Sequence, residues 1–458
     1  MGEPHVRPNG HAGVSTLLGN PRKAVLKLAW PMMLAQAVQL TYNLIGAFWV
    51  SGLGVNALTA VGFFFPFMFM VMAIAMGMGM GGSSAVSRCI GAGDRERAGR
   101  VATHTVVIMA AIAVAMTLPL LMLARPMFSA MGAGPALEDT VAFSRIMFSG
   151  TIILFFVNVA NSLLWGEGDA KRAMKAMLLG TVINIILDPI MIYTLGLGVT
   201  GAAWATLTSL SITAGILFYW LFLERGTYVT FRFRGFRFDR DIVREILRVG
   251  LPTSVQQLTM SINMIILNVI IVGIGGTDGV AVLTTGWRIT SMGILPLMGI
   301  ATAVVSVCGA AYGMKRYRRM EAALGYAIRI GLALELAAAA AILLLAGPIT
   351  SAFTKSAASI APDLERYFHI TWLFLPGVAL GMLSGSMFQG TGNGWKALAV
   401  TVLRTVVLTP PLAYGLAMWA GMGLEGVWLG LVLANVIGSS VSYVWARAYM
   451  RGLRRSAS

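Results

Sequence analysis

The sequence predicts an all-α membrane protein, with twelve transmembrane helices in two six-helix lobes related by a pseudo-twofold axis. Three observations lead to this prediction. Long apolar segments recur along the 458 residues, which are 57% hydrophobic and have a mean hydropathy of +0.78. Positive charge gathers in the short connectors between these segments, and motifs of the first half recur in the second half. Only 11% of the residues are charged, against about 25% in soluble domains.

The apolar segments are long enough to cross a lipid bilayer, which takes about 20 residues of helix. A backbone in lipid must satisfy its own polar groups, so only helices or closed barrels can span it. The segments exceed barrel-strand length and lack two-residue alternation, so we expect helices. The twelve predicted spans are Ala24–Trp49, Ala57–Val86, Val101–Ala124, Thr140–Trp165, Arg172–Leu195, Val199–Leu223, Ile246–Ile274, Val280–Tyr312, Ala322–Ala346, Leu364–Phe388, Trp395–Trp419 and Leu424–Tyr449.

The net charge of +16 lies mainly in connectors on one side of the predicted membrane. Positive residues mark cytoplasmic loops, so both termini are expected in the cytoplasm of a multi-pass plasma (inner) membrane protein. This distribution disfavours nucleic acid as a partner, and residues 1–21 lack the apolar core of a signal peptide. The predicted organisation is a polar cytoplasmic N-terminus (1–21), an N-terminal lobe (22–223), a basic cytoplasmic linker (224–245), a C-terminal lobe (246–449) and a basic cytoplasmic tail (450–458).

An internal repeat divides the chain into its two halves. The first span begins with Leu28-Ala29-Trp30-Pro31 and ends near Gly52-Leu53-Gly54. The seventh begins with Val249-Gly250-Leu251-Pro252 and ends near Gly273-Ile274-Gly275, so the proline and both glycines recur at one offset. Such repeats are typical of transporters that expose a central site alternately to the two sides of the membrane.

Several motifs, in order, carry a family resemblance. They include Ala57-Leu58-Thr59-Ala60-Val61-Gly62, the turns Gly91-Ala92-Gly93-Asp94 and Gly166-Glu167-Gly168-Asp169, and the run Asn184-Ile185-Ile186-Leu187-Asp188-Pro189. From about Pro21 to Arg447 the chain resembles the multidrug and toxic compound extrusion (MATE) transporters, in particular their DinF-like branch. The resemblance implies a V-shaped pair of lobes. It also implies a secondary-active antiporter that exports organic, often cationic or amphipathic, compounds by alternating access.

Asp188 is the strongest candidate for ion coupling, because a charged side chain inside a membrane is costly and is usually functional. Asn184 precedes it by one helical turn on the same face. Pro189 follows and removes a backbone hydrogen bond, which predicts a helix kink. The freed carbonyls, the carboxylate and the amide together suit a proton or a small cation. The alternative interpretation is that Asp188 only bonds a neighbouring helix.

The resemblance to the DinF-like branch extends the coupling site to Asn158, Asn184, Asp188, Thr206 and Tyr42, and implies a bend of the first helix at Pro31. One position departs from the branch. A first-helix aspartate is usual there, whereas this chain has Gly46. A hard cation such as sodium prefers more anionic oxygen than one aspartate supplies. We therefore favour protons over sodium as the coupling ion and leave both open.

A substrate cleft is expected from polar and adaptable side chains that face the centre of the bundle. Flexible thioethers accept varied ligands, and aromatic rings attract planar cations. Most of the methionines and phenylalanines of the second span are equally compatible with a lipid-facing role. The candidates are Gln39, Gly46, Met68, Phe64, Gln256 and Gln257.

Other ionisable residues inside the predicted spans are left without a firm role. Glu335 could replace the missing carboxylate or pair with a cation, and Arg288 and Arg404 could cap helices or contact an anion. A flippase for lipid-linked precursors, from the same superfamily, is the alternative function; it would need an arginine-rich cleft. We find no nucleophile motif, phosphate loop or metal-ligand spacing, so we expect no enzyme activity, no cofactor and no bound metal. The expected partners are small organic solutes and membrane lipids, with the protein as a monomer.

Overall fold

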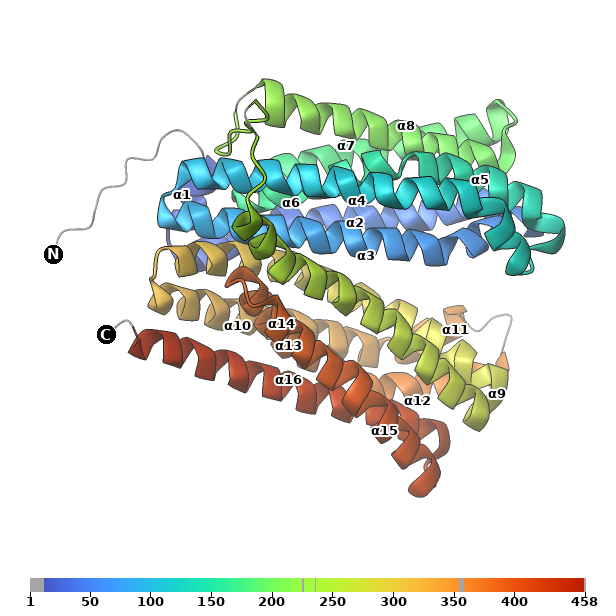
Figure 1. Cartoon of the computed structure of the whole chain (residues 1–458). Helices are drawn as coiled ribbons and strands as arrows, with labels where there is room; N and C mark the ends of the chain where they lie inside the picture. Colours follow the sequence, from blue (N-terminus) through green and yellow to red (C-terminus); the bar gives the residue numbers. More distant parts are fainter. Residues whose placement is uncertain (1–11, 225, 235, 354–357, 457–458) are drawn as a thin grey trace. The chain divides into compact units, whose positions relative to one another are not determined.

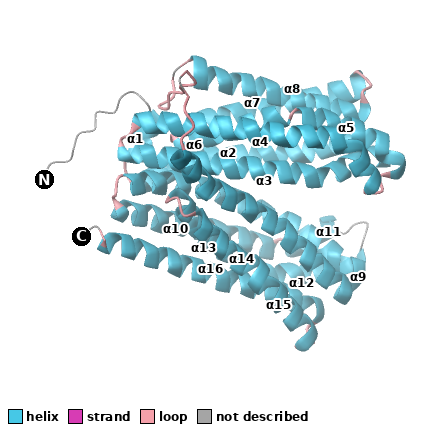
Figure 2. Ribbon diagram, viewed as in Figure 1, coloured by secondary structure: helices cyan, strands magenta, loops and turns pink. Residues whose placement is uncertain are grey.

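The computed structural model describes residues 12–224, 226–234, 236–353 and 358–456. Their regular secondary structure is helical throughout, and no strand occurs among them (Figure 2). The prediction of an all-α protein is therefore confirmed. The chain forms two compact units: the first comprises Met1–Gly19 and Leu34–Ser254, and the second Asn20–Met33 and Val255–Ser458. The second unit thus includes the start of the first long helix, which the sequence had assigned to the N-terminal lobe.

The first unit is built mainly from the helices before the central linker (Figure 1). Two of them, α7 and α8, pass into short π-helical segments, η2 and η3. The elements are α1 (Ala12–Leu18), α2 (Pro21–Ser51), α3 (Val55–Ala92), α4 (Arg95–Ala130), η1 (Gly134–Ala136), α5 (Leu137–Ser149), α6 (Thr151–Gly166), α7 (Ala170–Pro189), η2 (Ile190–Thr194), α8 (Gly198–Phe218) and η3 (Tyr219–Leu223).

The second unit contains the remaining helices (Figure 1). Its first helix, α9, is divided by Gly276, whose φ of 60° and ψ of −152° are not helical. The elements are α9 (Arg240–Gly313), α10 (Tyr317–Leu344), α11 (Ala346–Phe353), η4 (Ala358–Ile360), α12 (Ala361–Thr371), α13 (Phe374–Gly390), α14 (Gly394–Val402), η5 (Leu403–Leu408), α15 (Thr409–Tyr414), η6 (Gly415–Trp419) and α16 (Gly423–Arg455). The start of α9, up to Ser254, belongs to the first unit.

The helices confirm the predicted membrane class. Within the described residues, eight are long and apolar enough to cross a membrane, or ten when each of two bent pairs counts as one span. These pairs are α5 with α6, bent by 46°, and α12 with α13, bent by 49°. Each of the twelve predicted spans corresponds to helical structure. Some match a single helix or a helix with its π-helical extension, two match the bent pairs, and two match the parts of α9 before and after Gly276.

The core of the first unit holds α6, α7 and α8 together. Small residues of α7 pack against larger apolar side chains of α6, α8 and η3, which lets the helices approach closely. Burial of these side chains fixes the position of α7, which carries Asp188. The buried members of the cluster are Val157, Ala160, Leu164, Ala173, Ala176, Leu217 and Leu221.

Two glycine turns of the first unit share one geometry. Gly93 ends α3 with φ 76°, and Gly168 follows α6 with φ 81°, a region that favours glycine. The next residue caps the following helix: Asp94 accepts from the N–H of Arg97 at 2.8 Å, and Asp169 from that of Arg172 at 3.3 Å. The recurring Gly-x-Gly-Asp motif is therefore a helix-ending and helix-starting device.

Candidate coupling site in the first unit

Asp188 lies at the end of α7, one residue before the helix changes its hydrogen-bond pattern. Its side chain is buried, with 4% of its surface exposed, and that of Asn184 one turn earlier has 2%. Pro189 has no N–H and ends α7, after which η2 takes the wider π-helical form. The carboxylate is thus placed beside a break in the regular helix, inside a packed bundle.

The Asn184 amide lies between Asp188 and Thr206. When its nitrogen faces Asp188, Nδ2 donates to Asp188 Oδ2 at 3.1 Å, and its oxygen accepts from the Thr206 N–H of α8 at 3.1 Å. In the opposite orientation Nδ2 is 3.5 Å from Thr206 Oγ1. The first orientation satisfies both ends of the amide, so the hydrogen-bond network favours it. Three predicted site residues from two helices therefore form one contiguous group.

Gly46 of α2 faces this group. A Cβ atom built on Gly46 would lie 3.9 Å from Asp188 Oδ2, an ordinary van der Waals separation. The position where the DinF-like branch usually has an aspartate is therefore directly beside Asp188. Tyr42 lies in the same helix, but its side chain is outside the part of the chain that the structure describes. Its predicted role stays a prediction.

Asn158 of α6 has other partners. Its Nδ2 donates to the Leu154 backbone oxygen at 2.9 Å and lies 3.9 Å from Met72 Sδ of α3. Among the hydrogen bonds of the described residues, none joins Asn158 to Asp188. The amide therefore connects α6 with α3, which is the interhelical role that a polar residue commonly has in a membrane bundle.

The two predicted kink positions differ in their surroundings. At Pro189 the α-helix ends, and the Leu195 N–H donates to the Ile190 carbonyl at 2.9 Å in the π-helical pattern. Pro31, by contrast, lies inside α2, which continues as a helix on both sides of it. The Tyr193 hydroxyl of η2 donates to the Trp49 carbonyl of α2 at 2.6 Å, which ties the segment after Asp188 to the end of α2.

The predicted cleft residues of the first unit are unequally exposed. Gln39, Gly46 and Met68 are half-buried. Phe64 is buried, and its ring contacts those of Phe143 and Phe148 at centroid distances of 5.2 and 5.5 Å. The Phe64 ring therefore belongs to the interior packing of α3 against α5.

In the second unit, the predicted cleft residues Gln256 and Gln257 are half-buried. Gln256 donates to Thr401 Oγ1 of α14, and its oxygen accepts from Gln389 Nε2 of α13 at 3.1 Å. This amide chain links α9, α13 and α14. Gln256 is therefore part of a polar network inside the second unit.

The three ionisable residues that the sequence left open occupy different environments in the second unit. Glu335 is fully buried in α10, and within the described part of the chain neither of its carboxylate oxygens has a hydrogen-bond partner. Arg404 of η5 donates to Asn435 Oδ1 of α16 at 3.2 Å. Arg288 is exposed and takes part in no ion pair among the described residues. The described residues contain no group of three His, Cys, Asp or Glu side chains that could hold a metal.

Sequence reasoning missed the role of Glu167. This residue follows α6 and is buried, and its Oε2 accepts from the N–H groups of Tyr228 at 2.5 Å and Val229 at 3.1 Å. Burial raises the pKa of Glu167 to about 8, although the two backbone N–H groups act against the shift. The sequence signal was an acid between two glycines, which we interpreted only as part of a turn motif.

A family model described as MatE matches residues 31–190 and 252–415, which together make up well over half of the chain. The chain belongs to the MATE family. This membership confirms the resemblance drawn from the sequence motifs. The family model matches each half separately, which agrees with the internal repeat found in the sequence.

Individual relatives of this MATE chain cover nearly its whole length. It is 25% identical over 442 residues to a probable multidrug resistance protein NorM of Thermotoga maritima, covering 93% of this chain and 92% of the relative. A MATE protein solved in complex with MaL6 is 45% identical, with a TM-score of 0.94 and coverage of 97% and 99%. A MOP superfamily transporter of Pyrococcus furiosus, with the same identity and coverage and a TM-score of 0.93, was described as having a binding pocket of reverse polarity that suggests a different function.

Proposed function

We propose that this chain is a secondary-active antiporter, which exports organic cations or amphipathic compounds in exchange for protons by alternating access. The observation that carries the proposal is the group formed in the first unit by the buried Asp188 and Asn184 with the half-buried Thr206. An unpaired carboxylate in an apolar bundle is costly when charged. Binding a proton removes that cost, so occupancy by the coupling ion and the packing around Asp188 are linked.

Protons suit this site better than sodium. Gly46 leaves Asp188 as the one carboxylate of the group, which otherwise contains the amide of Asn184 and the hydroxyl residue Thr206 that Asn184 contacts. Sodium would need several more oxygen ligands around one negative charge. The multidrug resistance name of the Thermotoga maritima relative supports an organic substrate. We further propose a monomer in the plasma membrane, with both termini cytoplasmic and no catalytic activity.

The test is efflux of a fluorescent organic cation from proteoliposomes under an imposed pH or sodium gradient. We compare the wild type with Asp188→Asn and use Asp278→Asn as a matched control, because Asp278 is an exposed carboxylate outside the site. The proposal expects efflux driven by the pH gradient, a drop of about tenfold or more in Asp188→Asn, equivalent to about 1.4 kcal/mol or more, and a normal rate in the control. Unchanged efflux in Asp188→Asn would move the coupling role to Glu335, which Glu335→Gln then tests.

A flippase for anionic lipid-linked precursors is the second candidate. A different function was suggested for the similar Pyrococcus furiosus transporter, and for this reason we also test the flippase function. In the second unit Arg404 donates to Asn435 and packs against Gly438, so this arginine is engaged inside its own unit. That arrangement favours the exporter. Movement of a labelled lipid-linked anion by the same proteoliposomes, with no efflux of organic cations, would favour the flippase.

A further inference from the structure

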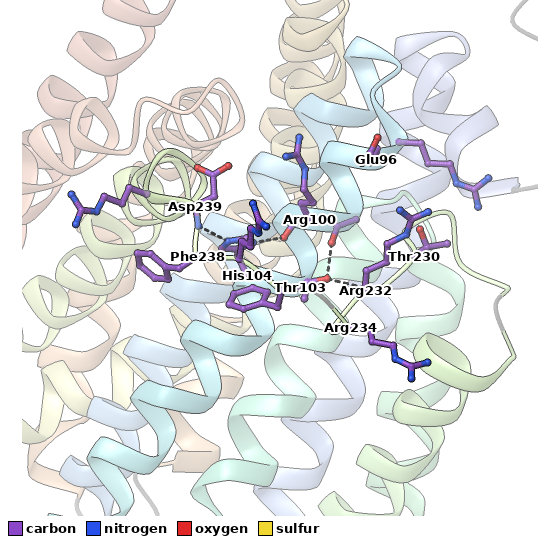
Figure 3. Close-up of a pocket in the computed structure, with 14 residues that line it drawn as sticks. Glu96, Arg100, Thr103, His104, Thr230, Arg232, Arg234, Phe238 and Asp239 are labelled. Carbon is purple, nitrogen blue, oxygen red and sulfur yellow. Dashed lines mark hydrogen bonds between the residues drawn. The ribbon is translucent and has the colours of Figure 1, made fainter.

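A cavity of about 990 Å³ lies in the first unit, beside the first turns of α4 (Figure 3). One wall is the start of α4, and the other is the linker that leads into α9. In Figure 3, Phe238 and Asp239 lie on one side, Arg232 and Arg234 on the other, and Arg100 between them. The cavity is formed within a single unit and is separate from the Asp188 group.

The lining of the cavity is strongly basic. It includes six arginines, and its two carboxylates are those of Glu96 and Asp239, so positive charge exceeds negative charge by four. Asp239 is already engaged, because its Oδ1 accepts from the N–H groups of Asp241 and Ile242 at the start of α9. The arginines are Arg95, Arg100, Arg232, Arg234, Arg237 and Arg240.

Among the described residues, no carboxylate forms an ion pair with any of these arginines. Arg95 is held by Tyr228, whose carbonyl accepts from Arg95 Nε at 2.9 Å and whose ring lies 5.1 Å below the guanidinium. The other five take part in none of the ion pairs formed among the described residues. Five guanidinium groups gathered around one cavity repel one another, and a bound anion relieves that repulsion.

Backbone hydrogen bonds fix the linker wall of the cavity against α4. The Arg232 N–H donates to Thr103 Oγ1 at 3.3 Å, and the Asp239 N–H lies 3.0 Å from His104 Nε2. A Cβ atom on Gly99 would lie 2.5 Å from the Thr230 carbonyl, so only glycine permits this approach. These three contacts, at Arg232, Asp239 and Gly99, hold the linker against α4 without a ligand.

Aromatic packing sets the direction of the linker side chains. Phe231 and Phe233 contact Phe222 of η3 at ring-centroid distances of 4.6 and 5.7 Å. Arg232 and Arg234, which alternate with these two rings in the sequence, line the cavity. Phe231 and Phe233 therefore anchor this part of the linker to η3, while the arginines between and after them line the cavity.

We propose that this cavity binds a phosphate-bearing anion through Arg100 and Arg232. Guanidinium groups match phosphate oxygens with paired hydrogen bonds. The positive-inside rule favours arginines on the cytoplasmic side of the membrane, but it does not require six of them to line one cavity. The ligand is either the headgroup of an anionic phospholipid or a soluble phosphate. The exposed ring of Phe238, with 64% of its surface free, favours a lipid because acyl chains can cover it.

Native mass spectrometry of the full, delipidated chain tests this proposal with three probes: phosphatidylglycerol, phosphatidylcholine and inorganic phosphate. The test variant is Arg100→Gln/Arg232→Gln. The control is Arg318→Gln/Arg451→Gln, which removes the same charge from exposed arginines of the second unit. We expect phosphatidylglycerol to bind the wild type and the control alike, and about tenfold more weakly to the test variant, a difference of about 1.4 kcal/mol.

The other outcomes are equally decisive. If inorganic phosphate binds the wild type and binds the Arg100→Gln/Arg232→Gln variant more weakly, the proposed site is supported and its ligand is a soluble phosphate. Phosphatidylglycerol that binds both variants equally overturns the proposal, and so does equal binding of phosphatidylcholine to the wild type. A second variant, Arg100→Lys/Arg232→Lys, keeps the charge but loses the paired donors, and a weakened binding there shows that guanidinium geometry matters. Thermal unfolding of each variant establishes that it is folded.

Discussion

Gly46 of α2 lies directly opposite Asp188 of α7: a Cβ atom on Gly46 would be 3.9 Å from Asp188 Oδ2. The two residues are far apart in sequence, and no spacing rule relates them. Their proximity means that the residue at position 46 decides how many carboxylates this group contains. In the present chain it contains one, whose carboxylate accepts from the amide of Asn184, and that amide in turn contacts Thr206.

The variants Gly46→Ala and Gly46→Asp test this relationship. We expect Gly46→Ala to keep most of the wild-type efflux, because its methyl group meets Asp188 at an ordinary contact distance. Gly46→Asp adds a second anionic ligand, so we expect sodium-driven efflux to appear or increase. Efflux under separate pH and sodium gradients measures both. Loss of efflux in Gly46→Ala, with normal folding, would show that the glycine is needed for helix movement instead.

Asn184→Leu should remove the hydrogen-bonded link through which Asn184 joins Asp188 to Thr206 of α8. Leucine has a similar size but cannot donate to Asp188 Oδ2 or accept from the Thr206 N–H, the two bonds that the amide makes. A buried polar group without a partner costs about 1–3 kcal/mol. We expect a lower unfolding temperature and slower efflux. Asn158→Leu is the comparison, since Asn158 bonds Leu154 and Met72 instead, and its efflux should fall less.

Glu167 should make the stability of the first unit depend on pH. Its pKa is raised from 4.5 to about 8 by burial, so the folded chain keeps a proton that the unfolded chain releases. The free energy of unfolding therefore falls as pH rises from about 4.5 to about 8, by at most about 1.4 kcal/mol per pH unit from this group. Thermal unfolding across pH 5–9 measures this fall.

Glu167→Gln removes the titrating carboxyl but keeps an oxygen that accepts from Tyr228 and Val229. We expect a flatter dependence of the unfolding temperature on pH in this variant. Glu138→Gln is the control, because Glu138 is exposed and pairs with Arg125. An identical pH dependence in the wild type and Glu167→Gln would contradict the assignment.

Gly168→Ala should destabilise the protein more than Gly93→Ala. Both glycines have positive φ, and a left-handed conformation costs a non-glycine residue about 1–2 kcal/mol. Nothing lies within 4 Å of a Cβ atom on Gly93. A Cβ atom on Gly168 would be 2.6 Å from the Gly13 carbonyl and 2.8 Å from Leu17 Cγ, so it also displaces α1. Equal unfolding temperatures would show that α1 adds nothing to the stability of this turn.

Hydropathy and charge were enough to predict the helical membrane class and the position of each apolar segment, and the order of the short motifs was enough to predict the family. A membrane helix satisfies its own backbone hydrogen bonds, so its signal is local and can be read residue by residue. Asp188 and Asn184 could be paired in the same way, because they lie one turn apart on a single helix.

The contacts between helices could not be predicted in this way. The family resemblance assigned Gly46 to the coupling site, but no pattern in the sequence itself placed it against Asp188. The sequence also did not show that Asn158 contacts Met72 and not Asp188, and it gave no sign that Glu167 holds the linker backbone. Each of these relationships joins residues on different segments, and rotation of one helix about its axis would change it. Side-chain packing between the helices sets that rotation, and so only the tertiary structure decided which polar groups meet.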